Sequence, residues 1–409
     1  MKPTNVLSAA LAGAIALSSC SADDPASTDS VTFPPASDIG PAPDPTPGPV
    51  PLPMPITGYV VAELPPRAGG STATVHAIGS DGRAVGEAEG CVFYLGQIHC
   101  GVVAVYWDPG QAPTVIPQLA GTTSNKATGI TDAGVIVGAS TDGSGHRHGW
   151  RWSAATGTTE MFSPVDGTSL IFNAATAGGW TTGIHFPPGK LGAHAFRYHL
   201  FGGAFQDLFP PCVRTLLNEL GLQGSIPPGH PVTDCLNDSE DLIATRGASI
   251  DAIGNVAGQL QVGVGQSVYA YFWPGVGGAV NLRAMNPSVD AKQATAVNGS
   301  VLGPYLASDG STRAYSWSGL SGGGLGDMGL SIGVFPNGLS NMGRLVGHSS
   351  TGNQRAVTWY ANKVIYLGVP GGMTFGDAVA VNRCGNVVGN AQDAAFKQRA
   401  FRWTKTGCD

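Results

Sequence analysis

Short apolar runs alternate with glycine- and asparagine-rich turns along most of the chain, and the pattern repeats about every 44 residues. The clearest unit begins with Ala378-Val-Ala-Val-Asn-Arg-Cys-Gly-Asn-Val-Val-Gly389 and closes with Arg399-Ala-Phe-Arg-Trp403. An Asn or Asp three residues before a glycine is a turn signal, and the apolar runs on either side of it suit strands. Each unit therefore starts with a predicted β-hairpin.

Seven copies of this unit can be aligned, although the third, around Asn173 to Gly183, lacks a clean turn motif. The copies share a turn glycine, a second glycine that usually follows four residues later, and a closing aromatic residue. The turn glycines are Gly82, Gly134, Gly254, Gly299, Gly343 and Gly385; the second glycines are Gly86, Gly138, Gly258, Gly303, Gly347 and Gly389; the aromatics are Trp107, Trp152, Tyr198, Trp273, Trp317, Trp359 and Trp403.

Two further strands complete each unit. The stretch that ends in Trp alternates inward and outward residues, and segments such as Val364-Ile-Tyr-Leu367 follow it. Four strands in a unit of this length form a propeller blade. The last copy lacks its fourth strand, but residues 59–64 look like one and precede the first hairpin. The sequence thus predicts an all-β, seven-bladed β-propeller over residues 58–409, closed by the pairing of this N-terminal strand with the last blade.

Composition agrees with an all-β protein, because only 12% of the residues are charged while 61 are glycine and 30 are proline. The formal net charge is −6, and no run of Lys or Arg offers a footprint for phosphates. We therefore expect no nucleic-acid partner.

The N-terminus reads as an export signal. Lys2 precedes an apolar stretch from Val6 to Leu17 that is too short to span a bilayer. Leu17-Ser-Ser-Cys20 resembles the bacterial lipobox, which implies a signal peptide over residues 1–19 and lipidation of Cys20; an ordinary secretory leader is the alternative. In such lipoproteins an aspartate directly after the cysteine is associated with retention in the inner membrane. Ser21 stands there in this chain, so the resemblance implies the outer membrane. Residues 20–57 include eleven prolines and form a predicted semi-rigid tether. The expected location is the bacterial cell envelope, periplasmic or surface-exposed, with the membrane as a partner through the lipid anchor.

The repeat skeleton, with His194-Ala195-Phe196 in the third copy, resembles the bacterial extracellular HAF repeats over nearly all of residues 59–403. This resemblance implies export and repeat architecture, and it implies no reaction and no catalytic residues. The chain departs from the family pattern in its third copy and in an insertion at about 206–247.

Six cysteines remain besides Cys20, an even number that suits disulfides in an oxidising compartment. Proximity in the sequence favours three pairs, and other connectivities stay open. No paired Cys-x-x-Cys points to structural zinc. The favoured pairs are Cys91 with Cys100, Cys212 with Cys235, and Cys384 with Cys408.

Loops that join the second strand of a blade to the third, or one blade to the next, emerge on the same face of a propeller. We call this the decorated face because the longest loops fall on it: Cys91–Cys100, Asp142–His148, His185–His194 and Phe209–Arg246. Loops on a rigid scaffold commonly build binding sites. The candidate ligand-binding residues are therefore His146, Arg147, Lys190, His230 and Asp234.

Three motifs suggest more specific chemistry. His146 and His148 could bind a metal with His185 and His194, but His148 and His194 share a repeat position with Arg313, Arg355 and Arg399, which favours a role at the start of a strand. Gly319-Leu-Ser-Gly-Gly323 matches a nucleophile elbow but lies in a predicted hairpin instead of between a strand and a helix. Residues 237–241 are acidic but lack calcium-loop spacing. The sequence predicts no catalytic residue, metal or cofactor.

The leading functional prediction is a lipid-anchored, extracytoplasmic binding or interaction module that presents loops to a glycan, peptide or protein. The alternatives are an extracellular enzyme that acts on a polymer, such as a glycan hydrolase or lyase, and a structural spacer of the envelope. Whether the protein is an enzyme stays open, and the sequence favours a binding protein.

Overall fold

The computed structural model describes residues 58–94, 97–188, 192–208, 243–262 and 267–275, a series of short stretches between 280 and 369 (280–281, 290–291, 295–297, 300–306, 312–318, 326–327, 334–340, 344–349, 354–360 and 363–369), and residues 372–407. The predicted signal peptide, the lipidated Cys20 and the tether lie outside the described residues. So do Lys190, Cys212, His230, Asp234, Cys235 and Cys408.

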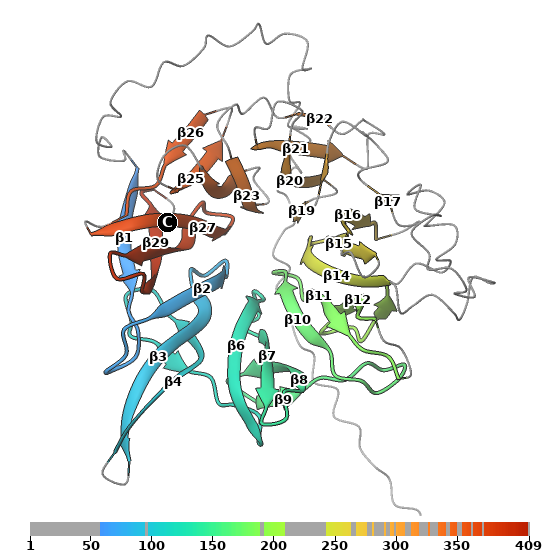
Figure 1. The fold of residues 1–409 in the computed structure, drawn as a ribbon, viewed down its shortest axis with the longest axis horizontal. Coiled ribbons are helices and arrows are strands. Elements are labelled where there is room, and N and C mark those ends of the chain that lie inside the picture. The colour runs from blue at the N-terminus through green and yellow to red at the C-terminus, as the bar shows by residue number, and fades with distance from the viewer. Residues whose placement is uncertain are drawn as a thin grey trace, which may run out of the picture. The chain divides into compact units, whose positions relative to one another are not determined.

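All named elements are strands, and they form seven antiparallel sheets (Figure 1). In chain order the first three sheets contain β2 (Ala73–Ile78), β3 (Ala84–Tyr94), β4 (Gln97–Trp107) and β5 (Thr114–Val115); β6 (Thr122–Ile130), β7 (Ile136–Asp142), β8 (Arg147–Ser153) and β9 (Gly157–Glu160); and β10 (Ile171–Ala175), β11 (Trp180–His185), β12 (His194–His199) and β13 (Phe205–Asp207). The next two contain β14 (Ile243–Ile250), β15 (Val256–Val262), β16 (Ser267–Trp273) and β17 (Val280–Asn281); and β18 (Asp290–Ala291), β19 (Thr295–Val297), β20 (Ser300–Leu306), β21 (Thr312–Ser318) and β22 (Gly326–Asp327). The last two contain β23 (Val334–Leu339), β24 (Leu345–Ser349), β25 (Arg355–Tyr360) and β26 (Lys363–Tyr366); and β27 (Met373–Val381), β28 (Val387–Asp393) and β29 (Gln398–Lys405) with β1 (Tyr59–Leu64).

The sheets follow one another around a closed ring, because each contacts the next and the last contacts the first through β28 and β2. The fold is therefore an all-β propeller. Six sheets are four-stranded blades, whereas the described residues of the β18–β22 sheet form five strands, so the prediction of a seven-bladed propeller is correct only in part. Strands β18 and β19 both pair with β20, and residues 292–294 between them lie outside the described residues.

The predicted closure is confirmed. Strand β1 pairs antiparallel with β29 from Tyr59 opposite Lys405 to Leu64 opposite Ala400. An ion pair between Glu63 and Arg399, with Nε 2.8 Å from the carboxylate, ties the two strands together. N- and C-terminal segments thus share one blade, which covers two strand edges that would otherwise be open.

The turn glycines within the described residues adopt positive φ, a conformation that glycine enters without a side-chain clash. Gly82 has a φ of 82° and Gly385 one of 81°. In the third copy Gly179, at 94°, holds the same place, and its N–H donates to the carbonyl of Thr176 at 3.0 Å. The third copy therefore keeps the hairpin that its sequence obscures, because Thr176 replaces the usual Asn or Asp.

The second glycines lie opposite a β-bulge that recurs in six inner strands. In β2, for example, Val75 pairs with Gly86 and Ala77 pairs with Val85, so His76 is the extra residue. A Cβ on Gly86 would lie 2.0 Å from the carbonyl oxygen of Thr74. The same approach, at 1.9–2.1 Å, recurs at Gly138, Gly183, Gly258, Gly347 and Gly389. Only glycine fits where the bulged strand presses a carbonyl against its neighbour.

The closing tryptophans pack between sheets, as predicted. Trp107 of β4 is fully buried with Leu64 of β1 and Val388 of β28. Trp403 of β29 is fully buried with Val346 of β24. Each of these two side chains therefore joins its own sheet to the sheet that precedes it around the ring.

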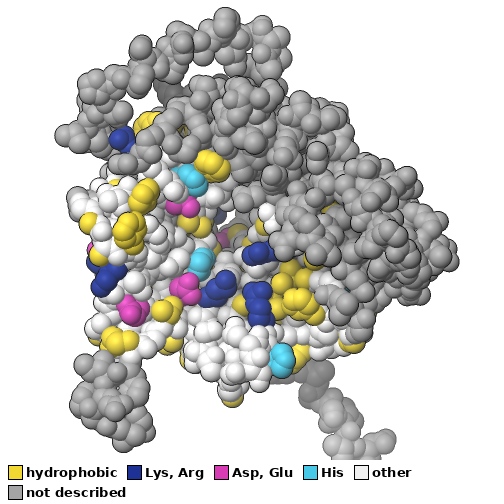
Figure 2. All heavy atoms as spheres, viewed as in Figure 1, with side chains coloured by type: hydrophobic (Ala, Val, Ile, Leu, Met, Phe, Trp, Pro, Cys, Tyr) yellow, Lys and Arg dark blue, Asp and Glu magenta, His cyan; other side chains and the backbone are white. Residues whose placement is uncertain are grey.

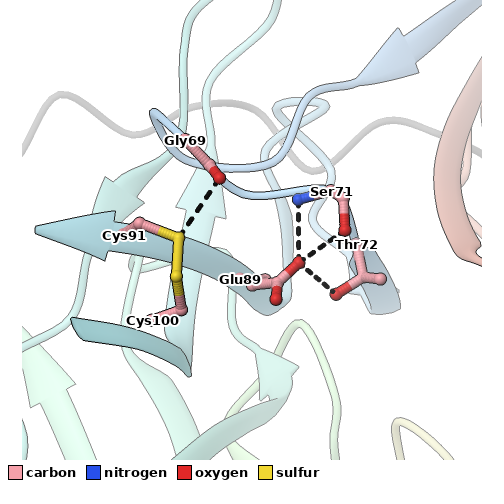
Figure 3. The surroundings of a disulfide bond; sticks show 6 residues. All are labelled: Gly69, Ser71, Thr72, Glu89, Cys91 and Cys100. Carbon is pink, nitrogen blue, oxygen red and sulfur yellow. Dashed lines mark hydrogen bonds between the residues drawn. A yellow bond between two sulfur atoms is a disulfide. The ribbon is translucent and has the colours of Figure 1, made fainter. Parts of the chain in front are cut away.

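The predicted disulfide between Cys91 and Cys100 is confirmed, and it links directly opposed residues of β3 and β4 (Figure 3). Beside it, the carboxylate of Glu89 accepts hydrogen bonds from the backbone and hydroxyl of Ser71, both at 2.8 Å. Cys384 is also disulfide-bonded. Its predicted partner Cys408 and the predicted pair Cys212 and Cys235 lie outside the described residues.

The predicted insertion at 206–247 overlaps paired strands at both ends, β13 and β14, and residues 209–242 between them lie outside the described residues. Within the described part of the chain, no helix is long and apolar enough to cross a membrane.

Substituting Gly183→Ala should lower the free energy of unfolding by about 3 kcal/mol, because the new Cβ would meet the carbonyl of Ile171 at 1.9 Å. Gly178→Ala in the same blade is the matched control, since nothing lies within 4 Å of its Cβ position. Denaturant titration measures both. Equal stability of the two variants would show that the carbonyl approach is not a constraint.

Candidate functional site

A cavity of about 420 Å³ lies among the inner strands of the ring. Figure 2 shows a hollow at the centre of the ring, with cationic, histidine and acidic side chains around it. The lining residues come from five sheets and are mostly polar. They are His76, Lys126, Thr128, Asn173, Arg246, Ala248, Ser249, Gln259, Pro336 and Asn337.

The bulges determine which side chains reach this cavity. Five of the lining residues are the extra residues of their bulges, namely His76, Thr128, Asn173, Ala248 and Asn337. Lys126 and Arg246 each lie two residues before a bulge, and residues two apart in a strand share a face. A repeated defect in the ladder thus turns one ring of side chains inward.

Three of the bulge side chains also join neighbouring sheets. The Thr128 hydroxyl donates to the carbonyl of Phe172 at 2.9 Å, and the Asn173 amide donates to that of Gly247 at 2.8 Å. The Asn337 amide donates to the carbonyl of Ala378 at 3.1 Å. Each acceptor is the residue just before the bulge of the next sheet. The polar wall of the cavity is therefore held in a fixed geometry.

The cavity is positively charged along β6 and β14, which lie on either side of β10. Within the residues that the structure describes, neither Lys126 nor Arg246 forms an ion pair. Burial, together with repulsion from Arg246, lowers the pKa of Arg147, which brings a third cation close to this region. In the neighbouring sheet, His76 lies 3.5 Å from Glu87, and its hydrogen bond lowers the pKa of that carboxyl against the opposing effect of burial, with a smaller contribution from the charge of Lys126.

Of the two predicted binding residues that the structure describes, Arg147 is connected with this site and His146 is not. Arg147 is close enough to Arg246 to be perturbed by it. His146 points into solvent with 78% of its side chain exposed, and its Nδ1 lies 3.3 Å from Asp142. Lys190, His230 and Asp234 fall outside the described residues.

The sequence analysis did not predict Lys126, Asn173, Arg246 and Asn337 as site residues. It placed the binding site on the long loops, whereas these four residues lie on strands. The signal was present, however. Each of these residues lies on an inner strand that pairs with a second glycine. On that strand, the residue that follows the glycine's partner is the extra residue of the bulge.

The Asp142–His148 loop is a compact turn with its own charge network. Asp142 accepts backbone hydrogen bonds from Ser144 and His146 at 2.8 and 2.9 Å. Burial opposes ionisation, but these bonds and those from the two histidines lower the pKa of Asp142 to about 2. His148 Nδ1 lies 2.7 Å from Glu160, and this hydrogen bond is the main reason that the pKa of His148 is raised.

The shared repeat position of His148 and His194 has the structural role that the alignment predicted. His148 of β8 pairs with Glu160 of β9, and His194 of β12 pairs with Asp207 of β13 at 2.8 Å. Arg399 of β29 pairs with Glu63 in the same way. In each case the start of the third strand is tied to an acid on the fourth.

Comparisons with known proteins give structural likeness without sequence kinship. No family model and no curated protein matches the chain. The chain is similar to the β-propeller domain of the Trilobed protease from Pyrococcus furiosus, with a TM-score of 0.49, 10% identity, and coverage of 82% of this chain and 95% of that one. It is also similar to TolB from Acinetobacter baumannii, with a TM-score of 0.37, 11% identity and coverage of 78% and 80%. For the fucose-specific lectin from Aleuria aurantia the TM-score is 0.33, the identity 12% and the coverage 66% and 89%. The resemblance to HAF repeats stays a prediction.

The His148–Glu160 pair should make stability depend on pH. Because the folded pKa of His148 lies above its ordinary 6.5, the pair stabilises the protein fully below pH 6.5, and the contribution is lost as pH rises through the folded value. Glu160→Gln should bring the His148 titration midpoint down toward 6.5 in an NMR titration. Glu87→Gln, which removes the acid beside His76, is the control and should leave it unchanged. A wild-type midpoint at or below 6.5 would contradict the pairing.

Proposed function

We propose that this protein is an extracytoplasmic binding module that takes an anionic, hydroxyl-rich ligand into the central cavity of its propeller. One observation carries the proposal. Lys126 and Arg246 line a polar cavity and form no ion pair with a described carboxylate, and Arg147 adds a third cation nearby. Cations that line one cavity are stabilised when a ligand brings negative charge between them.

The dimensions and chemistry of the cavity indicate the class of ligand. A volume of about 420 Å³ lies in the range of small-molecule sites. Amide and hydroxyl groups from Asn173, Ser249 and Gln259 suit sugar hydroxyls, whereas guanidinium and ammonium groups suit a carboxylate or phosphate. Among glycans, peptides and proteins, the three expected classes, this combination favours an acidic glycan unit or chain end.

Further parts of the proposal rest on the sequence. Lipidation of Cys20 would anchor the protein in the cell envelope as an outer-membrane lipoprotein. The Pro-rich tether would hold the propeller up to roughly 100 Å from the lipid, so that its cavity can meet envelope or extracellular polymers. We also propose that the β18–β22 sheet serves as the seventh blade of the ring.

Binding to a uronic-acid oligosaccharide and to its carboxyl-reduced neutral counterpart tests the charge argument. We expect saturable binding of the acidic form only. Lys126→Met and Arg246→Met should each weaken it by about tenfold or more, because each removes a charge-assisted hydrogen bond worth about 1.5–3 kcal/mol. Calorimetry on the full chain measures the affinities.

Lys397→Met is the matched control, because Lys397 is an exposed cation in the loop between β28 and β29. Its affinity should stay within about twofold of the wild type. Equal binding of the acidic and neutral sugars, or full affinity in the Lys126→Met variant, would contradict the proposal. Shortening of the polymer over time would favour the alternative of a polymer-acting enzyme.

A further inference from the structure

Two histidines face each other inside the β10–β13 sheet. His185 of β11 and His194 of β12 are directly opposed residues, and their side chains are only 2% and 6% exposed. Asp207 of β13 lies beside both, with its Oδ2 3.5 Å from His185 Nε2 and 2.8 Å from His194 Nδ1. None of the three lines the central cavity.

The repeat does not account for this pair. His194 with Asp207 repeats the strand-start pairing of His148 with Glu160, but His185 has no counterpart. The residues two positions after the second glycine in the other copies are Ala88, Ser140, Leu260, Tyr305, Ser349 and Ala391. A second imidazole beside the first, both withdrawn from water, is therefore specific to this blade.

A second acidic group orients His185. Its Nδ1 lies 3.5 Å from Asp166 Oδ2 and 3.3 Å from the hydroxyl of Thr168. A hydrogen bond from Nδ1–H to the Thr168 hydroxyl, which itself donates to Asp166 Oδ1 at 2.7 Å, leaves Nε2 with a lone pair directed toward Asp207. Histidines that bind metals are held in this way, with the other ring nitrogen donating to a carboxylate or carbonyl.

The surroundings suit a metal site. The rings of Phe205 and Phe196 pack edge-on against His185, with centroids 5.5 and 6.3 Å from its own, and form an apolar wall behind it. Asp207, with 38% of its side chain exposed, provides access from solvent. One ligand atom from each of His185, His194 and Asp207 can be chosen so that all lie within 4.8 Å of one another.

We propose that His185, His194 and Asp207 bind a divalent transition metal ion, with zinc as the first candidate, and that Asp166 positions His185 for it. Two imidazoles and one carboxylate are a ligand set that zinc accepts with a fourth position left for water or a substrate group. Zinc bonds of about 2.0–2.2 Å place tetrahedral ligand atoms roughly 3.3–3.6 Å apart, which the 3.5 Å between His185 Nε2 and Asp207 already meets. The site departs from the prediction that the chain binds no metal. It also excludes His146, which instead lies with Asp142.

Titration of the chelator-treated full chain with zinc, followed by calorimetry, tests the proposal, and cobalt absorption reports the coordination number. We expect one equivalent to bind with a four-coordinate cobalt spectrum. His185→Asn and His194→Asn should each weaken binding by about 100-fold or more, and Asp166→Asn by about 10- to 100-fold. His148→Asn is the matched control, because it removes the equivalent histidine of the neighbouring blade and should leave the affinity within about twofold.

Absence of a one-equivalent binding event in the wild type would overturn the proposal. So would a loss of binding in His148→Asn with retention in His185→Asn. If the His185 variant does not fold, imidazole ¹⁵N shifts of the wild type on zinc addition decide the matter. Shifts at His185 and His194 support the site, whereas shifts at other histidines alone contradict it.

Discussion

The close approach of a carbonyl group to a glycine is the constraint on which this propeller depends. In six blades the inner strand bulges opposite the second glycine and presses a backbone oxygen to within 1.9–2.1 Å of where a Cβ would be. That approach is possible only because the strand carries an extra residue, and the extra residue is possible only because its neighbour has no side chain. The glycine that marks the sequence repeat is thus the counterpart of a repeated irregularity in the ladder.

The bulge links the scaffold to the proposed site. In five of these blades it turns one side chain toward the cavity, and it gives Thr128, Asn173 and Asn337 an acceptor on the next sheet. Because these hydrogen bonds run around the ring, the same residues hold the blades together and form a fixed polar wall. A ligand that enters the cavity therefore meets groups whose ordering is already provided by the fold, which reduces the entropy lost on binding.

The fold was predictable because glycine turns, strand patterns and buried tryptophans recur at a fixed period, and because residues 59–64 matched the missing strand. Cys91 and Cys100 were predictable because they face each other across one hairpin. The cavity was not predicted from the sequence, because it depends on the bulges. A bulge interrupts the alternation of side chains along a strand, and simple alternation is the signal that would have placed Lys126 and Arg246 on the inner side. The His185–His194 pair needed the strand register, because the two residues lie nine positions apart in the sequence and meet only across β11 and β12.

The central claim is that the charged cavity on the propeller axis is where the ligand binds. A crystal structure of the full chain with a uronic-acid oligosaccharide tests it most directly. The account predicts a carboxylate of the sugar between Lys126 and Arg246, with hydroxyl groups within hydrogen-bond distance of Asn173 or Gln259. An oligosaccharide bound only to the loops of the decorated face, with water in the cavity, would contradict it.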